Sequence, residues 1–436
     1  MTIPDVNLTF STRRFPMAFV LAGGRGARMF PLTIDRAKPA VPFGANYRVI
    51  DFALSNIYHS GIRKICVLTQ YESESLHRHI RNGWYPRFGV GVNEFITTLP
   101  AKQGELGGWY LGTADSISKN IRYVHREKPD IVDVLGGDHI YVMDIGEKNH
   151  YHQQKGAEIT ISAVPVPIAD AAGNYGVLVV DDDMRLVAFE EKPPHPTPMP
   201  GNDKMCLASM GNYAFDADIL VAELKEDSKK IFTTKKNQID ADPDKYSAHD
   251  FGYNVLPTAL RHERRIYVYN FQEKGVPGGE ERERGFWRDV GNLDQFYQAN
   301  MEIISQDPPL NLYNNDWKIL TYVESPQPAK VMSTREEMGY AMNSLLANGV
   351  VVNHAIVENS VLHYGCRVNR MAKIKKSILL GRIMVGENTR IKNAIIDKYV
   401  DIPAGIEIGY DTELDRQRGF TITPGGITVI PHKYKF

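Results

Sequence analysis

The sequence predicts an α/β protein with two architectures in series: a domain built on a mostly parallel sheet, followed by a parallel β-helix. Two features of the first part predict the sheet. Short apolar runs alternate with helical segments there, and glycine clusters stand where those runs end. One feature of the last part predicts the β-helix, because aliphatic residues recur there every six positions.

The first part carries apolar runs of strand length at residues 15–22, 64–69, 131–135 and 158–166, and residues 47–57 have helical spacing. Runs of this length that alternate with helices are typical of strands buried on both faces of a sheet. Ligands of such sheets bind beyond the carboxyl ends of the strands. Both glycine clusters are expected at that edge.

The last part has a period that neither a helix nor an alternating strand produces. A hexapeptide β-helix does produce it, because one aliphatic residue of each short strand turns inward. Chance spacing in a β-sandwich is the competing interpretation. The residues are Ile356, Leu362, Val368, Ile374 and Leu380, then Val385 and Ile391, then Ile396, Ile402 and Ile408.

These patterns predict a first domain at residues 1–305, a linker at 306–330 and a β-helix domain at 331–436. The linker contains two proline-rich stretches. Within the first domain, the polar segment 229–248 is expected to lack regular structure.

Composition excludes several classes of function. The chain of 436 residues has 51 basic and 52 acidic residues, a net charge of −1, so binding of nucleic acid or membranes by bulk charge is not expected. No apolar stretch approaches the ~18 residues of a membrane span. The first 16 residues lack the pattern of a signal peptide, and the three cysteines suggest free thiols in a reducing compartment. We therefore expect a cytoplasmic protein.

A glycine-rich loop follows the first predicted strand. Gly23, Gly24 and Gly26 allow close approach of the backbone to an anion, and Arg25 and Arg28 add charge. The loop matches neither a Walker A loop nor the dinucleotide-binding motif, and a plain tight turn explains it equally well. Downstream, Lys38 precedes a proline and is interpreted as a phosphate ligand rather than a solvated lysine.

Two aspartates are candidates for a divalent cation. Asp138 follows Gly136-Gly137 at the end of a buried run, and Asp289 precedes the glycine turn at Gly291. Each is equally explained as a turn or helix-cap aspartate, and the sequence does not determine whether they meet. A further pair, Glu191-Lys192, ends another apolar run, although a lone pair of this kind is usually a surface ion pair.

These motifs carry a resemblance. The stretch from Leu21 to Asn56 resembles the N-terminal signature of sugar-phosphate nucleotidyltransferases, and most closely that of the bacterial glucose-1-phosphate adenylyltransferases. The similarity extends over nearly the whole chain. It implies a Rossmann-like nucleotidyltransferase domain followed by a left-handed β-helix. It also implies Mg²⁺-assisted attack of glucose 1-phosphate on the α-phosphorus of ATP, giving ADP-glucose and pyrophosphate for glycogen synthesis.

The resemblance assigns roles to residues that match the family's motifs. The catalytic residues would be Arg28, Lys38 and Asp138, and Mg²⁺ would be held by Asp138 and Asp289. ATP would contact Leu21, Gly23, Gly24, Gly26, Gln70 and Gly112. Glucose 1-phosphate would contact Tyr110, Gly176, Glu191, Lys192 and Ser209.

Three alternatives stay open: transfer of another nucleotide to give a UDP-, dTDP- or GDP-sugar, a non-catalytic regulatory subunit, and a hexapeptide acyltransferase. The resemblance implies a homotetramer with anionic allosteric effectors. Asp35 stands where members activated by fructose 1,6-bisphosphate often carry a basic residue, and Leu111 stands where many members carry a charged one. Four arginines are interpreted in two ways: they line an anion-binding site, or they form part of a solvated surface. They are Arg13, Arg14, Arg36 and Arg48.

Overall fold

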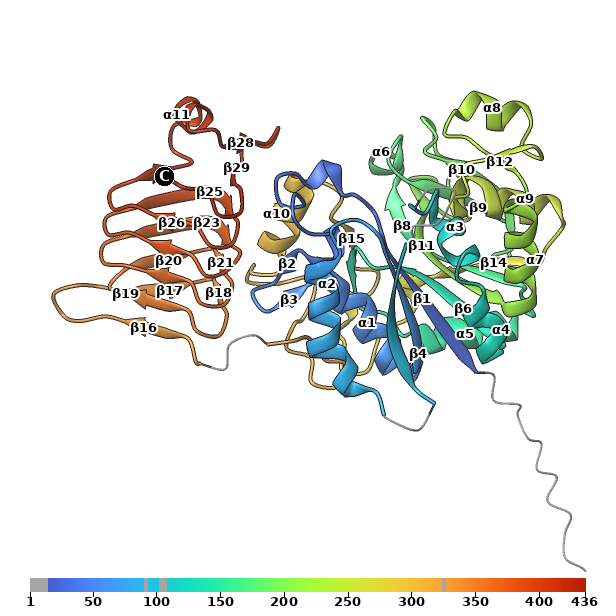
Figure 1. The fold of residues 1–436 in the computed structure, drawn as a ribbon, viewed down its shortest axis with the longest axis horizontal. Coiled ribbons are helices and arrows are strands. Elements are labelled where there is room, and N and C mark those ends of the chain that lie inside the picture. Colours follow the sequence, from blue (N-terminus) through green and yellow to red (C-terminus); the bar gives the residue numbers. More distant parts are fainter. Residues whose placement is uncertain (1–14, 90–92, 102–107, 324–326) are drawn as a thin grey trace, which may run out of the picture.

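The computed structural model describes residues 15–89, 93–101, 108–323 and 327–436. A large domain of sheet and helices, blue to yellow in Figure 1, lies beside a stack of short strands in orange and red. The first domain ends with α10 (Leu293–Glu302), and the stack begins with β16 (Lys330–Met332). Positions 324–326 of the predicted linker lie outside the described residues, as do Arg13 and Arg14.

The centre of the first domain is parallel. Its strands are β1 (Pro16–Ala22), β4 (Lys64–Thr69), β5 (Phe95–Pro100) and β6 (Ile131–Gly136), in the order β6-β1-β4-β5. The predicted runs thus form strands, with ends that shift by a residue or less. Leu21 pairs with Gly136, so the register brings the two glycine clusters to one edge.

Beyond β6 the sheet becomes mixed. Strand β11 pairs antiparallel with β6, β8 and β9, and its register against β8 shifts between Ser209 and Tyr213. Such a shift bends a strand and re-aims its side chains. Strands β8 and β14 pair in parallel at the side. The strands of this half are β8 (Ile159–Pro167), β9 (Gly176–Val180), β10 (Leu186–Glu191), β11 (Met205–Asp216) and β14 (Ile266–Asn270).

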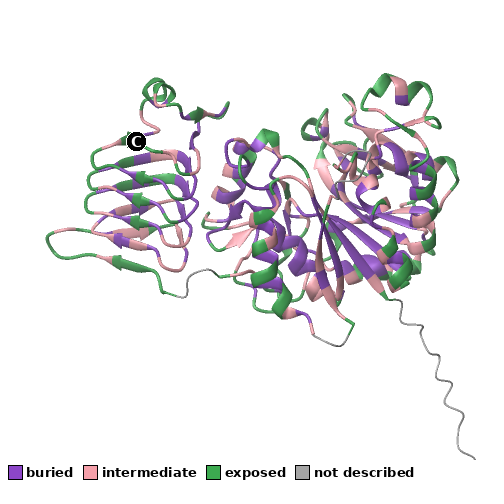
Figure 2. Ribbon diagram, viewed as in Figure 1, coloured by how far each residue is buried: buried purple, intermediate pink, exposed green. Residues whose placement is uncertain are grey.

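The helices of the first domain cover this sheet, and Figure 2 shows its strands as mostly buried. The predicted helix is α1 (Val49–His59), whose start is stabilised because Arg48 N donates to Asp51 at 2.8 Å. The other helices are α2 (Glu74–His79), α3 (Thr113–Ser118), α4 (Arg122–Glu127), α5 (Ile145–Gln154), α6 (Ile168–Ala171), α7 (Ala217–Asp227), α8 (Lys236–Ala241) and α9 (Leu256–Arg261).

The prediction that segment 229–248 lacks regular structure is wrong. It contains β12 (Ile231–Phe232), helix α8 and β13 (Tyr246–Ser247), and the two strands pair in parallel. Its polar composition misled the prediction, because hydrogen bonds within the segment and to the end of α7 hold it. Ser247 Oγ, for example, donates to Asp227 at 2.6 Å.

The second part is a β-helix with three sides, each a parallel ladder of short strands (Figure 1). The first side is β16, β19 (Val351–Asn353), β22 (Arg367–Val368), β24 (Met384–Val385) and β26 (Asp401–Ile402). The second and third share the long strands β23 (Lys373–Leu379) and β25 (Arg390–Ile396). They also contain β17 (Tyr340–Met342), β18 (Leu345–Leu346), β20 (Ile356–Glu358), β21 (Val361–Leu362), β27 (Glu407–Ile408) and β29 (Thr428–Ile430).

The predicted period is confirmed with one correction. The strand partners Val368 and Val385, and likewise Ile374 and Ile391, lie 17 residues apart. One side of these coils is therefore a residue shorter than the other two, which explains why the six-residue count restarts. Earlier in the stack, Val352 and Val368 are partners 16 residues apart. Ile356 was predicted to point inward, but Val357 takes the buried position and pairs with Ile374.

The two domains share a continuous hydrophobic core that includes Phe43 and Phe296 of the first and Ile374 and Ile395 of the second. Polar contacts add to it: Tyr297 Oη donates to Lys376 O at 2.7 Å. Arg36 is buried and donates to both carboxylate oxygens of Asp397, at 2.9 and 2.8 Å. Arg36 is therefore part of the contact between the domains rather than of a solvated face.

The three cysteines are free, as predicted, and all three are buried. Among the helices of the described residues, none has the length and apolar character that crossing a membrane requires.

Candidate functional site

The glycine loop forms the floor of the site at the carboxyl end of β1. Gly24 leaves open space where a Cβ would stand, so its backbone is accessible from the cavity. Gly26 adopts a left-handed conformation with φ of 62°, and a Cβ there would meet Lys38 and Thr33 at 3.2 Å. The loop therefore requires glycine at position 26 for its own fold, whereas the backbone at position 24 is open to the cavity.

The two arginines of the loop differ in position. The Arg25 guanidinium lies over the rings of Phe30 and Tyr71, at 5.9 and 5.7 Å from the ring centroids. Arg28 lines the main cavity and the smaller one beside it. Of the two, Arg28 is thus the one placed against the space where an anion would bind.

Lys38 lies between the two predicted metal ligands. Its Nζ donates to Asp138 Oδ2 and to Asp289 Oδ1, at 2.9 Å each, and the side chain is nearly fully buried. Burial alone would lower the pKa of Lys38, but the two carboxylates outweigh it and raise that pKa. Burial would raise the pKa of Asp138, yet Lys38 and then His139 hold it down at about 2. Lys38 and Asp138 are thus both charged at neutral pH.

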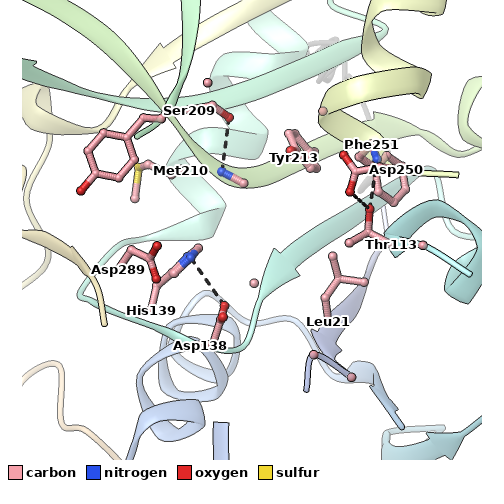
Figure 3. A pocket seen from close by; sticks show the side chains of 18 of the residues that line it. Leu21, Thr113, Asp138, His139, Ser209, Met210, Tyr213, Asp250, Phe251 and Asp289 are labelled. Carbon is pink, nitrogen blue, oxygen red and sulfur yellow. Dashed lines mark hydrogen bonds and ion pairs between the residues drawn. The ribbon is translucent and has the colours of Figure 1, made fainter. Parts of the chain in front are cut away.

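The pairing of two short strands explains why the aspartates meet. Strand β7 (His139–Tyr141) runs antiparallel to β15 (Trp287–Asp289), with Asp289 directly opposite His139. Ligand atoms of Asp138, His139 and Asp289 all lie within 4.8 Å of one another. Figure 3 shows the three side chains together, with the contact of 3.5 Å between His139 Nε2 and Asp138 Oδ1. This cluster has the charge and donor atoms for a divalent cation.

Two of the predicted sugar ligands are also neighbours across a ladder. Gly176 of β9 pairs with Glu191 of β10, and a Cβ at position 176 would lie 2.7 Å from the ring of Phe189. Lys192 has a left-handed backbone, with φ of 50°, and its Nζ lies 3.4 Å from Glu191 Oε1. Its side chain is half exposed, so the ammonium can reach into the cavity.

The opposite wall carries Gln70 and Tyr110. Tyr110 N donates to Gln70 Oε1 at 2.6 Å, which leaves the Gln70 amide N–H groups for a ligand. Tyr110 Oη donates to Leu99 O at 3.1 Å, so the ring rather than the hydroxyl faces the cavity. A Cβ on Gly112 would overlap the carbonyl oxygens of Ala248 and His249. Glycine at position 112 is therefore a packing requirement.

The predicted residues converge on two adjoining cavities, of about 640 Å³ and about 270 Å³. The smaller cavity is lined by Gly26, Lys38 and Arg28, among others. The larger one is lined by the remaining predicted residues, which are Leu21, Gly23, Gly24, Gln70, Tyr110, Gly112, Asp138, Gly176, Glu191, Lys192, Ser209 and Asp289. Their assignment to ATP or to the sugar phosphate stays a prediction.

Sequence reasoning missed part of the lining. Asp250 projects into the large cavity and accepts from Thr113 Oγ1 at 2.9 Å (Figure 3). Tyr213 and Phe251 line the same wall. Asp250 belongs to none of the motifs used above and follows the polar segment interpreted as irregular, so no local signal marked it.

Leu111 and Asp35 were noted in the sequence as differing from the residues that other proteins often carry at these positions, and both have clear positions in the structure. Leu111 is 45% exposed, and its N–H donates to Asp115 at 2.8 Å, so its side chain lies outside the cavity. Asp35 pairs with Arg36 at 3.3 Å and with His432 of the β-helix, at the contact between the domains.

Comparison with known proteins extends over both domains. The nucleotidyl transferase family matches residues 17–306, and the GlmU-like, C-terminal hexapeptide family matches residues 327–430. The chain is 47% identical over 426 residues to a glucose-1-phosphate adenylyltransferase of Thermus thermophilus, which covers 96% of this chain and 99% of that protein. Proteins of the same name from Anaeromyxobacter sp. and Geobacter metallireducens are 41% and 42% identical, over 95% of this chain and 97% and 96% of theirs.

Proposed function

The chain belongs to the nucleotidyl transferase family and, within it, to the glucose-1-phosphate adenylyltransferases, and we propose that it makes ADP-glucose and pyrophosphate from ATP and glucose 1-phosphate. One observation of the molecule carries this proposal. The glycine loop, two aspartates and Lys192, from four separate segments, border the same pair of cavities. The product serves the synthesis of glycogen.

The reaction needs no catalytic base. A sugar phosphate has its second pKa near ~6 and is largely dianionic at neutral pH, so its oxygen attacks the α-phosphorus of ATP directly. The protein must bring two polyanions together in line and stabilise the charge of the departing pyrophosphate. Glycine-loop N–H groups and the side chains of Arg28 and Lys38 are placed to do so.

The residues fit a divalent cation, and we propose Mg²⁺ as the resident metal. Asp138 and Asp289 would hold it, since two converging carboxylates are the hard oxygen ligands that Mg²⁺ prefers. When bound, it would supply positive charge to phosphate oxygens at the reacting centre. Lys38 keeps both carboxylates in place from the protein side, through its two hydrogen bonds of 2.9 Å.

The wall formed by β9, β10 and β11 is proposed to bind glucose 1-phosphate. Glu191 would accept from sugar hydroxyls, Ser209 would donate its hydroxyl, and Gly176 allows close approach. Lys192 would pair with the phosphate and align it for attack, which is a positioning role. Across the cavity, Tyr110 would lie against the sugar and Gln70 would contact adenine.

Lys192→Ala is expected to raise the KM for glucose 1-phosphate by about tenfold or more, with a smaller effect on kcat, because one charge-assisted contact is lost. Initial rates at varied glucose 1-phosphate and saturating ATP measure it. Lys204→Ala removes an exposed lysine of the nearby β10–β11 connection and should change neither KM. A change confined to the ATP dependence would contradict the assignment.

The proposed substrate pair is tested with a panel of nucleotides. Purified chain with Mg²⁺ and glucose 1-phosphate should release pyrophosphate from ATP well above UTP, dTTP or GTP. A preference for another nucleotide would replace ADP-glucose by another nucleotide sugar. Complete inactivity with all four would favour a regulatory subunit, although all six charged residues of the proposed site are present: Arg28, Lys38, Asp138, Glu191, Lys192 and Asp289.

We propose that the β-helix supports a cytoplasmic homotetramer that responds to anionic effectors. Its first coil exposes apolar side chains, including Val331 and Met342, which subunit contacts would cover. Arg48 and Lys398, one from each domain, line a small cavity at the contact between the domains, where an anion would bind.

The assembly is tested by size-exclusion chromatography with light scattering. We expect a mass four times that of the chain at micromolar concentration. A monomer would contradict the proposal.

A further inference from the structure

A buried polar cluster lies behind the large cavity without lining it. His249 Nδ1 and Asp227 Oδ2 are 2.6 Å apart, and Ser247 Oγ donates to the other oxygen of Asp227 at 2.6 Å. His249 N donates to Ser247 Oγ at 2.8 Å, which closes a ring of three residues. All three are at most 5% exposed. Nothing in the proposed reaction uses this cluster directly.

The cluster holds a strained backbone. His249 has φ of 53°, in the left-handed region that residues other than glycine seldom adopt. Asn254 Oδ1 accepts from the N–H groups on either side of it, of Ala248 at 3.1 Å and of Asp250 at 3.3 Å. The ring of Phe232 stacks on the imidazole at 5.9 Å. The surroundings thus impose this conformation, and the His249 side chain is the anchor at its centre.

The strained turn is joined to the cavity wall by consecutive hydrogen bonds. Ala114 N donates to His249 O at 2.8 Å, and Gly112 packs against the same carbonyl. Thr113 Oγ1 donates to Asp250 at 2.9 Å and accepts from Phe251 N at 3.0 Å (Figure 3). A shift of His249 would therefore move both residues 112–114 and the Asp250 carboxylate.

Beside Asp250, the affected wall meets the one proposed to bind the sugar. A Cβ on Gly252 would lie 3.5 Å from Asp250 Oδ1 and 3.5 Å from the Phe189 ring. That ring in turn contacts Gly176, the cross-strand partner of Glu191. Asp250 is thereby connected through adjacent contacts to the residues assigned to glucose 1-phosphate.

We propose that His249 is a positioning residue for the sugar phosphate: through its hydrogen bond to Asp227 it holds the left-handed turn that sets the place of Asp250 and of residues 112–114. This inference rests on the proposed function. His249 and Asp227 themselves do not line the cavity and touch neither substrate. Binding of glucose 1-phosphate then depends on the buried hydrogen bond between His249 and Asp227, which lies on the side of the wall that faces away from the cavity.

Three substitutions separate the hydrogen bond from the backbone conformation. In His249→Asn, the side-chain N–H takes the place of Nδ1–H, and asparagine tolerates the left-handed region. His249→Gly keeps the conformational freedom and loses the anchor, and His249→Ala loses both. We expect His249→Asn to keep the KM for glucose 1-phosphate within about threefold, and the other two to raise it about tenfold or more. The KM for ATP should change less than that for glucose 1-phosphate, although Gly112, which packs against the same turn, is a predicted ATP contact.

His152→Ala is the matched control. His152 is equally buried and is held by Thr160 and Asp216, at 2.7 and 3.4 Å, but, unlike His249, it has no chain neighbour that lines the cavity. It should lower the thermal midpoint and leave both KM values unchanged. Asp227→Asn, which keeps an acceptor for Ser247, provides a second variant should His249→Ala not fold, and it should also raise the KM for glucose 1-phosphate.

An unchanged KM for glucose 1-phosphate in His249→Gly and Asp227→Asn would overturn the positioning role, and so would an equal rise in both KM values. A rise in His249→Asn as large as in His249→Gly would overturn the role of the hydrogen bond. Failure of the proposed function itself is distinguishable, because then the unsubstituted chain would make no ADP-glucose.

Discussion

Asp138→Asn is expected to lower turnover by about 10²- to 10³-fold, because it removes one of two anionic ligands for the divalent cation at the reacting centre. It also removes one of the two carboxylates that accept from Lys38 Nζ, so that only the one of Asp289 remains of this pair. Pyrophosphate release at saturating ATP and glucose 1-phosphate measures the loss. Binding of Mn²⁺, followed by electron paramagnetic resonance, should weaken in parallel.

Folding should be little affected by this change. The Asp138 side chain is 35% exposed, so the amide remains hydrated, and the thermal midpoint should stay close to that of the unsubstituted chain. Asp182→Asn, at an exposed aspartate in the turn between β9 and β10, is the control and should retain full activity. Near-normal turnover in Asp138→Asn would refute the metal assignment.

Lys148→Met is expected to cause the largest loss of stability, about 3–5 kcal/mol in the free energy of unfolding. Lys148 Nζ lies 2.6 Å from Asp133 Oδ1, and both side chains are fully buried. Methionine retains the apolar stem but leaves the Asp133 carboxylate buried without its cation. Asn149, which donates to Asp133 at 2.8 Å, does not neutralise that charge. Urea unfolding of the full chain, followed by tryptophan fluorescence, measures the effect.

Two further variants isolate the buried charge. Lys155→Met removes a lysine just after α5, the helix that contains Lys148. Lys155 pairs with the exposed Asp183, so its loss should lower the free energy of unfolding by no more than about 1 kcal/mol. The double substitution Lys148→Met, Asp133→Asn leaves no buried charge and should be more stable than Lys148→Met alone. If the single and double variants were equally unstable, lost packing rather than the unpaired carboxylate would be the cause.

Much of the fold follows from local patterns. The apolar runs at β1, β4 and β6 and the helical spacing at α1 predicted those elements closely, because buried strands and amphipathic helices have characteristic periods. The six-residue period predicted the β-helix. The lengths of its coils and the inward place of Val357 depend on how successive coils align, which a period alone does not specify.

The residues of the candidate site also differ in whether a local sequence pattern predicted them. Gly26 and Asp138 became candidates because each belongs to a short motif at the end of a strand, and Lys38 because it precedes a proline. Asp250 and His249 were not, because their place depends on contacts with residues 112–114, more than 130 positions earlier in the chain.

The sequence by itself determined the kinds of elements, the glycine loop and the candidate charged residues, because those properties depend on neighbours within a few positions. Only the tertiary structure decided that Asp138 meets Asp289, through the pairing of β7 with β15, and that Gly176 faces Glu191, through the pairing of β9 with β10. It also placed the buried Lys148 beside Asp133. The physical reason is that strand register and side-chain packing between distant segments depend on the whole core, and no local stretch of sequence carries that information.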